Sequence, residues 1–250
     1  MAAAWLAFFD GLLALVLIAT GMLFAYLQLV APFVGFQMFA FGFLLSILGA
    51  LIGLLAVFLT RKPERRAGRQ RALVGLVICL AIAVPIFSML ARGAKHPIND
   101  ITTDVDNPPE FVFALTLPQN QGRDLKYDKA KYAARQQASE GIIAPLKERI
   151  EPTAAFARVL DVAQKVPTWK VTYSDPAKNT LEAVATSKLF HFHDDVIIQI
   201  RPTPAGESLI EMRSKSRDGI GDFGVNARRI HRFFDRIALS RGPSANEEMP

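Results

Sequence analysis

The chain has one cysteine, Cys79, in 250 residues, and one charged side chain, Asp10, in its first 60. A single cysteine excludes a disulfide within the chain, so a globular part must be held together by its own core. The lack of charge excludes an ordinary water-exposed surface for residues 1–60. It also argues against an ion or proton pathway there, because such pathways use ionisable side chains inside the membrane.

The net charge of +6 does not indicate a nucleic-acid partner. Residues 61–92 carry seven Lys or Arg and one acid, whereas residues 93–250 carry 22 Lys or Arg against 21 Asp or Glu. The basic excess therefore lies beside the apolar region and not on a globular surface. We expect no nucleic-acid partner.

Long apolar segments predict three transmembrane helices, since roughly 20 residues suffice to cross a bilayer. They lie at about 5–30, 33–60 and 72–92. A cleaved signal peptide is not expected, because no basic stretch opens the first segment and a second apolar segment follows at once.

The short loop 61–71 sets the expected orientation in the membrane. It carries six of the basic residues, and loops rich in Lys and Arg stay in the cytoplasm. We therefore expect a transmembrane region at 1–94 with a cytoplasmic N-terminus and a lipid bilayer as its partner. Everything after Arg92 is expected on the outer side. Gly49 and Gly53 form a G-x-x-x-G pattern, which predicts close packing among the helices.

Residues 95–250 have the patterns of an α+β domain. Apolar periodicity predicts helices at 128–140, 153–166 and 222–239, and alternation predicts strands at 111–117, 168–174, 181–193, 196–202 and 208–217. The turns between the last four strands are short, so we expect an antiparallel sheet with flanking helices. Thr153 and Asp222 are expected helix N-caps, and the Pro-rich segment 96–109 is expected to be a stalk lying against the domain.

The segment 219–224 has the G-x-G-x-x-G spacing of dinucleotide-binding loops. Such a site also needs a second parallel strand after the helix. Only about ten residues follow the predicted helix, and Asp218 and Asp222 place carboxylates where a pyrophosphate would bind. We expect neither a dinucleotide nor another cofactor.

Two blocks of sequence carry a resemblance to a known family. They are I-N-D-I-T-T-D at 98–104, followed by Pro-Pro, and S-K-S-R-D-G-I-G-D-F-G-V-N-A-R-R-I at 214–230, with L-F-H-F-H-D-D-V at 189–196 between them. Over about 95–240 the chain resembles the family called domain of unknown function 1499, found in bacterial envelope proteins and in plant plastids. The residues in its motifs are Asn99, Asp100, Thr103, Asp104, Pro108, Pro109, Ser214, Ser216, Arg217, Gly219, Gly221, Asp222 and Gly224. The resemblance implies a compartment, the bacterial inner membrane with the domain in the periplasm, and it implies no reaction.

Two histidines are weak candidates for a metal site. His191 and His193 would project to the same side of the predicted strand 181–193, close to Asp195. Two imidazoles and a carboxylate can bind Zn²⁺ or another divalent ion. The alternative is a strand that ends in an Asp-Asp turn, with the histidines pairing across the sheet, and on that basis we expect no metal.

Other polar pairs have ordinary structural explanations. Asp104 and Asp106 could act together as carboxylates, but in a Pro-rich segment they more often cap turns. Ser214 and Ser216 alternate with charged residues and have no nucleophile elbow around them. We expect a strand with the serines on one face and the charges on the other.

The last predicted helix has an apolar stripe, formed by Ile230, Phe233, Phe234 and Ile237, and a basic side. The candidate residues for binding an anionic lipid or another envelope protein are Asn226, Arg228, Arg229, Arg232 and Arg236. The alternative is an internal network in which Arg217 and Arg228 pair with Asp218, Asp222 or Asp100.

These observations favour a membrane-anchored protein with a non-catalytic binding or assembly domain in the periplasm. The alternative function is an envelope enzyme, a metal-dependent hydrolase that would use His191, His193 and Asp195. A transporter accessory subunit is not distinguished from the first hypothesis by the sequence.

Overall fold

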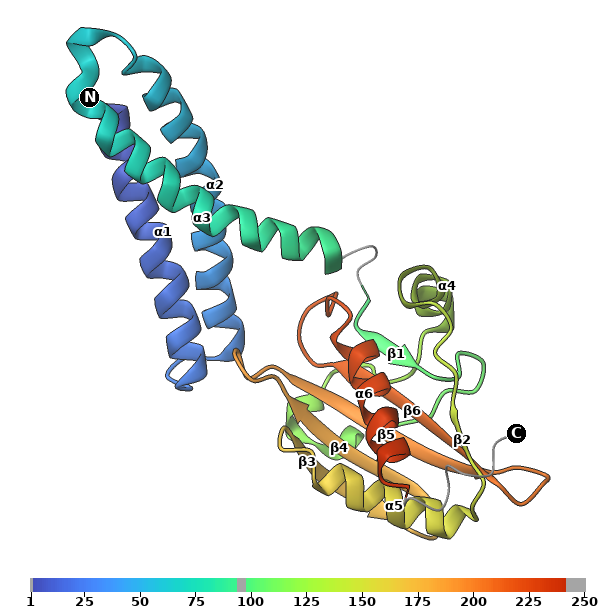
Figure 1. Cartoon of the computed structure of the whole chain (residues 1–250). Helices are drawn as coiled ribbons and strands as arrows, with labels where there is room; N and C mark the ends of the chain where they lie inside the picture. Colours follow the sequence, from blue (N-terminus) through green and yellow to red (C-terminus); the bar gives the residue numbers. More distant parts are fainter. Residues whose placement is uncertain (1, 94–97, 242–250) are drawn as a thin grey trace. The chain divides into compact units, whose positions relative to one another are not determined.

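The computed structural model describes residues 2–93 and 98–241. The chain divides into two compact units (Figure 1). A helical unit contains the residues up to Gly93 together with the short segment Lys188–His191, and a globular unit contains the rest.

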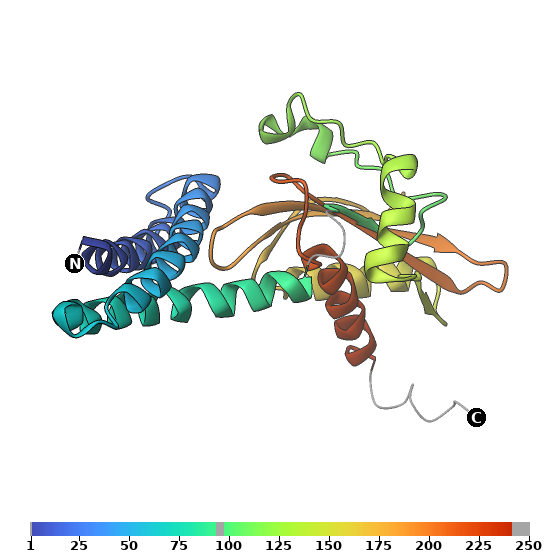
Figure 2. The same cartoon turned by 90° about the horizontal axis from the view of Figure 1, so that it is seen from above.

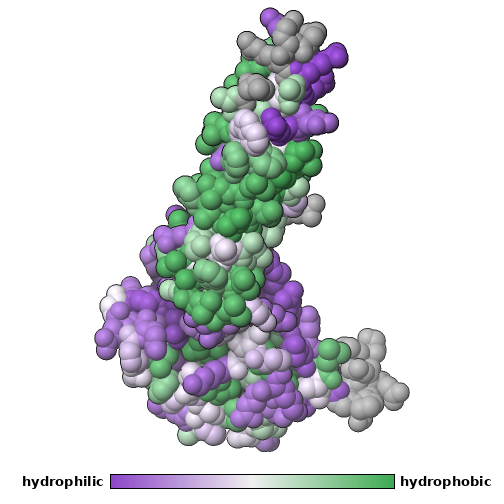
Figure 3. Space-filling view, turned by 90° about the vertical axis from the view of Figure 1, so that its left-hand side faces the viewer, coloured by the Kyte–Doolittle hydropathy of each residue, from purple (hydrophilic) through white to green (hydrophobic). Residues whose placement is uncertain are grey.

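The helical unit consists of α1 (Ala2–Tyr26), α2 (Pro32–Leu59) and α3 (Arg69–Gly93), with a short 3-10 helix, η1 (Pro63–Gly68), before α3. All three long helices are long and apolar enough to cross a membrane, which confirms the prediction of three long apolar helices. Their outward surface is largely hydrophobic (Figure 3).

Small residues let these helices approach closely. A Cβ atom added at Gly21 of α1 would lie 2.7 Å from the carbonyl oxygen of Gly35 in α2. At Gly53 an added Cβ would lie 3.0 Å from the Cβ of Leu76 in α3. The predicted G-x-x-x-G contact is therefore made within this chain, between α2 and α3.

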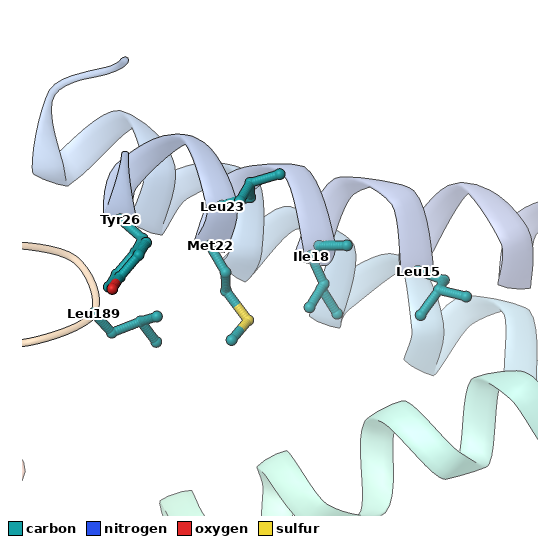
Figure 4. A pocket seen from close by; sticks show the side chains of 7 residues that line it. Leu15, Ile18, Met22, Leu23, Tyr26 and Leu189 are labelled. Carbon is teal, nitrogen blue, oxygen red and sulfur yellow. The ribbon is translucent and has the colours of Figure 1, made fainter. Parts of the chain in front are cut away.

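The segment Lys188–His191 packs with the helices of its unit. The Phe190 ring meets the rings of Phe36 and Phe39 edge-on, with centroids 5.7 Å apart in each case. Leu189 helps to line a shallow hollow beside α1, together with Leu15, Ile18, Ala19, Met22, Leu23 and Tyr26 (Figure 4). The lining is apolar, so the hollow offers almost no polar group to orient a ligand. Its apolar surface is compatible with lipid tails.

The globular unit is an antiparallel sheet in the order β1-β6-β5-β4-β3, with β2 also paired to β6. The strands are β1 (Asp100–Thr102), β2 (Leu146–Glu148), β3 (Trp169–Asp175), β4 (Thr180–Thr186), β5 (His193–Pro202) and β6 (Ser208–Ser216). The helices are α4 (Lys129–Glu140), α5 (Pro152–Gln164) and α6 (Val225–Leu239). Helices α5 and α6 cover one face and the irregular segment 104–127 covers the other (Figure 2). This confirms the α+β prediction.

The main core lies between the sheet and the two helices. Ile230, Phe233 and Ile237 of α6 are buried as predicted, and Phe234 is half-buried against them. The ring of Phe233 stacks on that of Trp169 in β3, with centroids 4.8 Å apart. The apolar stripe of α6 therefore closes the core.

The segment 111–117 is not a strand, contrary to the prediction. It bends into a 3-10 turn, η2 (Ala114–Thr116), because the Glu182 carboxylate accepts hydrogen bonds from the backbone N–H groups of Val112, Phe113 and Ala114 at 2.6–2.9 Å. A second 3-10 turn, η3 (Pro118–Asn120), follows. Phe111 and Ala114 pack against Ile197 of β5, but the segment 111–117 does not join the sheet as a strand.

Other sequence boundaries also need correction. The expected stalk contains β1, which pairs with β6 and so belongs to the sheet. Residues 94–97 lie outside the described residues. The long predicted strand 181–193 ends at Thr186, and β2 was not predicted. Helix α5 starts at Pro152 after Glu151, so Thr153 lies within its first turn and is not its N-cap.

Candidate functional site

The two motif blocks meet in space because β1 pairs with β6. Asp100 lies opposite Lys215 in the register, and Asp195 of β5 lies opposite the same residue from the other side. Directly opposed residues project from the same face of a sheet. Charged groups that are far apart in sequence are thus gathered under the segment 104–127.

Asp100 is the centre of the first cluster. Its carboxylate accepts from Arg213 Nε at 2.9 Å, from Arg213 Nη2 at 2.8 Å and from Lys215 Nζ at 2.8 Å. The side chains of Asp100 and Arg213 are completely buried, and that of Lys215 is 9% exposed. Asp100 therefore balances two buried cations through charge-assisted bonds.

Arg213 also fastens the irregular segment to the sheet. It donates to the carbonyl oxygen of Leu125 at 2.8 Å and to that of Pro109 at 3.3 Å. The rings of Phe111 and Tyr127 flank its guanidinium, at 4.9 and 5.3 Å from their centroids. Burial, with a smaller effect of the Asp100 charge, raises the pKa of Tyr127 to about 12, so its phenol stays neutral.

Asp195 forms a second ion-pair cluster. It accepts from Arg217 Nη2 at 2.6 Å, from Arg123 Nη1 at 3.0 Å and from Asn120 Nδ2 at 3.1 Å. Arg123 also donates to the carbonyl oxygen of Ser216 at 2.8 Å. Two guanidinium groups already neutralise this carboxylate, which disfavours an additional metal cation beside it.

Glu182 holds the same segment by its backbone. Burial raises the pKa of Glu182, while the three N–H groups of residues 112–114 oppose that rise. Capping a chain turn with a buried carboxylate satisfies backbone donors that no strand partner reaches. Its role is therefore to anchor the segment on the sheet.

Polar residues on the helix-covered face form a third cluster. Asn226 is fully buried and its amide oxygen accepts from Ser214 Oγ at 2.7 Å, while its amide nitrogen donates to Ser216 Oγ at 3.0 Å. Arg229 reaches the same oxygen and forms an ion pair with Asp194. Asn226 and Arg229 are thus used inside the domain.

The loop before α6 is shaped by Asp222. Its carboxylate accepts from the N–H of Gly224 at 2.9 Å and from that of Asn226 at 2.8 Å. Gly224, with φ of +75°, takes the N-cap position that was predicted for Asp222. Gly219 also has a positive φ, +79°, and Gly221 is half-buried between them. Burial raises the pKa of Asp222.

The residues that follow β1 are likewise structural. Thr103 donates its N–H to the carbonyl oxygen of Met212 at 2.9 Å and accepts from the Met212 N–H at 3.0 Å. Asp104 accepts from the N–H groups of Asp106 and Asn107, which is a turn cap and not a carboxylate pair.

Pro108 and Pro109 follow in the same segment. Pro108 is half-buried, and the buried Pro109 supplies the carbonyl oxygen to which Arg213 donates. Asn99, directly before β1, donates to the carbonyl oxygen of Gly219 at 2.6 Å. These motif residues hold loops to the sheet.

The histidines do not share a strand. His191 has a φ of +58° and lies in the segment grouped with the helical unit, where its Nδ1 is 2.6 Å from Gln28 Nε2. His193 begins β5, and its Nδ1 is 3.0 Å from Thr186 Oγ1. The i, i+2 geometry behind the metal hypothesis is therefore wrong. Across the described parts of the chain, no three His, Cys, Asp or Glu side chains are grouped to hold a metal.

The outer side of α6 is basic. Arg228, Arg232 and Arg236 are exposed at a spacing of four residues, which places them along one side of the helix. Within residues 2–93 and 98–241, no carboxylate is found in an ion pair with any of these three. Their charges face solvent, unlike that of Arg229.

The internal network exists, but with partners that the sequence did not predict. Arg217 pairs with Asp195, and Asp100 pairs with Arg213 and Lys215. Strand alternation predicted that Arg213, Lys215 and Arg217 lie on one face of the strand. It did not predict that the segment 104–127 would cover that face. These ion pairs could have been predicted by pairing the short segment that contains Asp100 with the basic strand that contains Arg213 and Lys215.

Comparison with known proteins identifies the family of the globular unit. No curated protein matches the chain. A family model described as "Protein of unknown function (DUF1499)" matches residues 100–237, a stretch that begins at β1 and ends within α6. Because the match covers more than half of the chain, this protein is a member of the DUF1499 family.

Proposed function

We propose that this protein is a membrane-anchored, non-catalytic module whose globular domain lies outside the cytoplasm and binds an acidic component of the bacterial cell envelope. The observation that carries the proposal is the contrast between its polar groups. The motif carboxylates and Arg213, Lys215, Arg217 and Arg229 are bonded within the domain, whereas three other arginines of α6, Arg228, Arg232 and Arg236, face solvent. Charges that the fold does not use are available to a partner.

The arginine surface, defined as Arg228, Arg232 and Arg236, suits an acidic protein better than a small anion. The three residues extend over about 12 Å along the helix, at 1.5 Å per residue, and present separate guanidinium groups. A small anion would need converging donors, whereas a row of exposed cations matches a row of carboxylates.

The basic loop 61–71 supports the proposed side of the membrane. Loops of this composition between two spans stay in the cytoplasm, which puts the end of α3 on the opposite side. A reporter that is active only outside the cytoplasm should work when fused after residue 250 and fail when fused at residue 66. Activity of the second fusion alone would place the domain in the cytoplasm and overturn the envelope assignment.

Binding is tested in cells with the full chain. A photo-crosslinking residue in place of Arg232 should capture a protein, whereas the same residue in place of the exposed Lys170 of β3 should not. With the crosslinker moved to position 228, Arg232→Glu with Arg236→Glu should abolish the adduct, and Lys170→Glu with Lys178→Glu, an equal change of charge, should not. An adduct that survives reversal of the α6 charges, or one that contains only lipid, would overturn the acidic-protein partner.

The metal-dependent hydrolase has no comparable support. His191 and His193 lie in different surroundings, and two arginines pair with Asp195. The contacts therefore favour the binding module over the hydrolase.

A further inference from the structure

The loop between β6 and α6 exposes apolar side chains that the domain does not bury. The side chain of Ile220 is 83% exposed, that of Phe223 is 46% exposed and that of Val225 is 39% exposed. Ile142, which is 84% exposed, is two residues beyond Glu140, and the Glu140 carboxylate lies against Gly224. Contiguous exposed apolar side chains mark an interaction surface more often than scattered ones do.

The loop is held firmly while it presents these residues. The N–H of Asp222 donates to the carbonyl oxygen of Ile98 at 2.9 Å, and Asn99 Nδ2 donates to the carbonyl oxygen of Gly219 at 2.6 Å. Phe223 has a φ of +53°, a conformation that costs a bulky side chain free energy. An aromatic residue kept there without full burial is explained by a role outside the fold.

The same hydrogen bonds connect the loop to residues 98 and 99, which follow soon after α3 in the sequence. Ile98 is five residues after Gly93, where α3 ends, and five residues reach at most about 18 Å. Helix α3 has 25 residues, about 38 Å at 1.5 Å per residue, which exceeds a hydrocarbon core of about 30 Å. The end of α3 is therefore expected at the bilayer interface, and the short connection in sequence limits how far Ile98 can lie from it.

We propose that the loop 219–225 inserts Ile220, Phe223 and Val225 into the interfacial region of the bilayer that holds the three helices. Apolar and aromatic side chains at headgroup depth gain free energy from burial. The charges next to the loop are two carboxylates, Asp218 and Glu140, and one guanidinium, Arg228, so the loop has no positive excess. Insertion therefore depends on apolar burial and does not require anionic lipid.

The test uses the full chain in phosphatidylcholine vesicles at a low ratio of protein to lipid. In a Cys79→Ser background, Ile220→Cys carries a fluorophore that brightens in an apolar environment. The matched control is Ala205→Cys, an exposed site in the β5–β6 turn, at the opposite end of those strands from the loop. Each labelled protein is exposed to lipids with nitroxide near the headgroup, and separately to a water-soluble quencher present on both sides of the membrane.

We expect the label at 220 to lose most of its fluorescence to the nitroxide lipids and little to the aqueous quencher. The label at 205 should behave in the opposite way. If the label at 220 responds like the control, the loop lies in water. If neither quencher reaches it, protein covers the loop. Either result overturns the proposal. The inference holds on either side of the membrane, so failure of the topology test would leave it intact.

Discussion

Replacing Asp100 by Asn tests whether the buried ion-pair cluster holds the globular domain together. The change keeps the size of the side chain but removes the charge that balances Arg213 and Lys215. An amide has one accepting oxygen, so in either orientation its NH₂ group faces at least one N–H donor of Arg213. Two cations are left without a counter-charge in a site where Asp100 and Arg213 are completely buried.

We expect Asp100→Asn to lower the free energy of unfolding by about 3–5 kcal/mol, the usual cost of breaking a buried ion pair. The midpoint of thermal unfolding should fall by an amount on the order of 10 °C. The matched control is Asp106→Asn, which removes an exposed pair with Lys129 whose side chains are 60% and 69% accessible. That change should cost less than about 1 kcal/mol.

The assay is urea unfolding of the full chain in detergent micelles, followed by fluorescence. The sequence has two tryptophans, and Trp5→Phe leaves only Trp169, which stacks on Phe233 in the core of the globular unit. The loss caused by Asp100→Asn should be the same at low and high salt, because a buried pair is poorly screened. A loss below about 1 kcal/mol, or one that salt removes, would refute the view that this cluster is a buried structural centre.

Two further predictions concern pH and the faces of α6. Burial holds the pKa of Glu182 above its unfolded value of 4.5, so the folded domain binds this proton more tightly than the unfolded chain does. The contribution of Glu182 to stability is therefore largest below pH 4.5 and is lost as pH rises through the folded pKa. Glu182→Gln should therefore flatten the fall of unfolding free energy as pH rises above 4.5, and an unchanged slope would contradict this. Phe233→Ala should cost about 3–5 kcal/mol because the ring is buried, whereas Arg232→Ala on the exposed side should change the urea midpoint little. Equal effects of the two changes would contradict the assignment of the faces.

Local patterns predicted the elements whose partners are apolar. The spacing of Ile230, Phe233 and Ile237 identified the buried side of α6, because a helix that packs on a sheet needs only a stripe of apolar residues. The three long apolar helices of the helical unit followed from the length and hydropathy of their segments. Neither prediction required knowledge of a distant residue.

The failures arose where a distant polar group decides the conformation. Val112, Phe113 and Ala114 have the composition of a strand, but the carboxylate of Glu182, about seventy residues away, captures their N–H groups and turns the chain. Arg213 is a strand residue of the expected kind, yet its burial depends on Asp100, 113 residues earlier. Sequence alternation gives the face of a residue and not what covers that face.

The two faces of the sheet are covered in different ways, and this explains the abundance of charged motif residues. Helices α5 and α6 satisfy their own backbone, so apolar side chains suffice beneath them. The segment 104–127 has little regular structure, so its backbone groups need other partners. Glu182 accepts from its N–H groups, while Arg213 donates to its carbonyl oxygens.

The motif charges are therefore accounted for by the need to fold an irregular segment onto a sheet. Two groups of exposed side chains are not needed by the fold, namely the arginine surface of α6 and the apolar residues of the loop 219–225. Grouped exposed apolar side chains mark an interaction surface more often than single ones do, and a row of like charges suits a partner of opposite charge. A polar partner suits the first feature and the bilayer suits the second, and both lie on one continuous stretch of chain from 219 to 236. The search for activity in this family is therefore better directed at α6 and the loop before it than at the buried acids of β1 and β5.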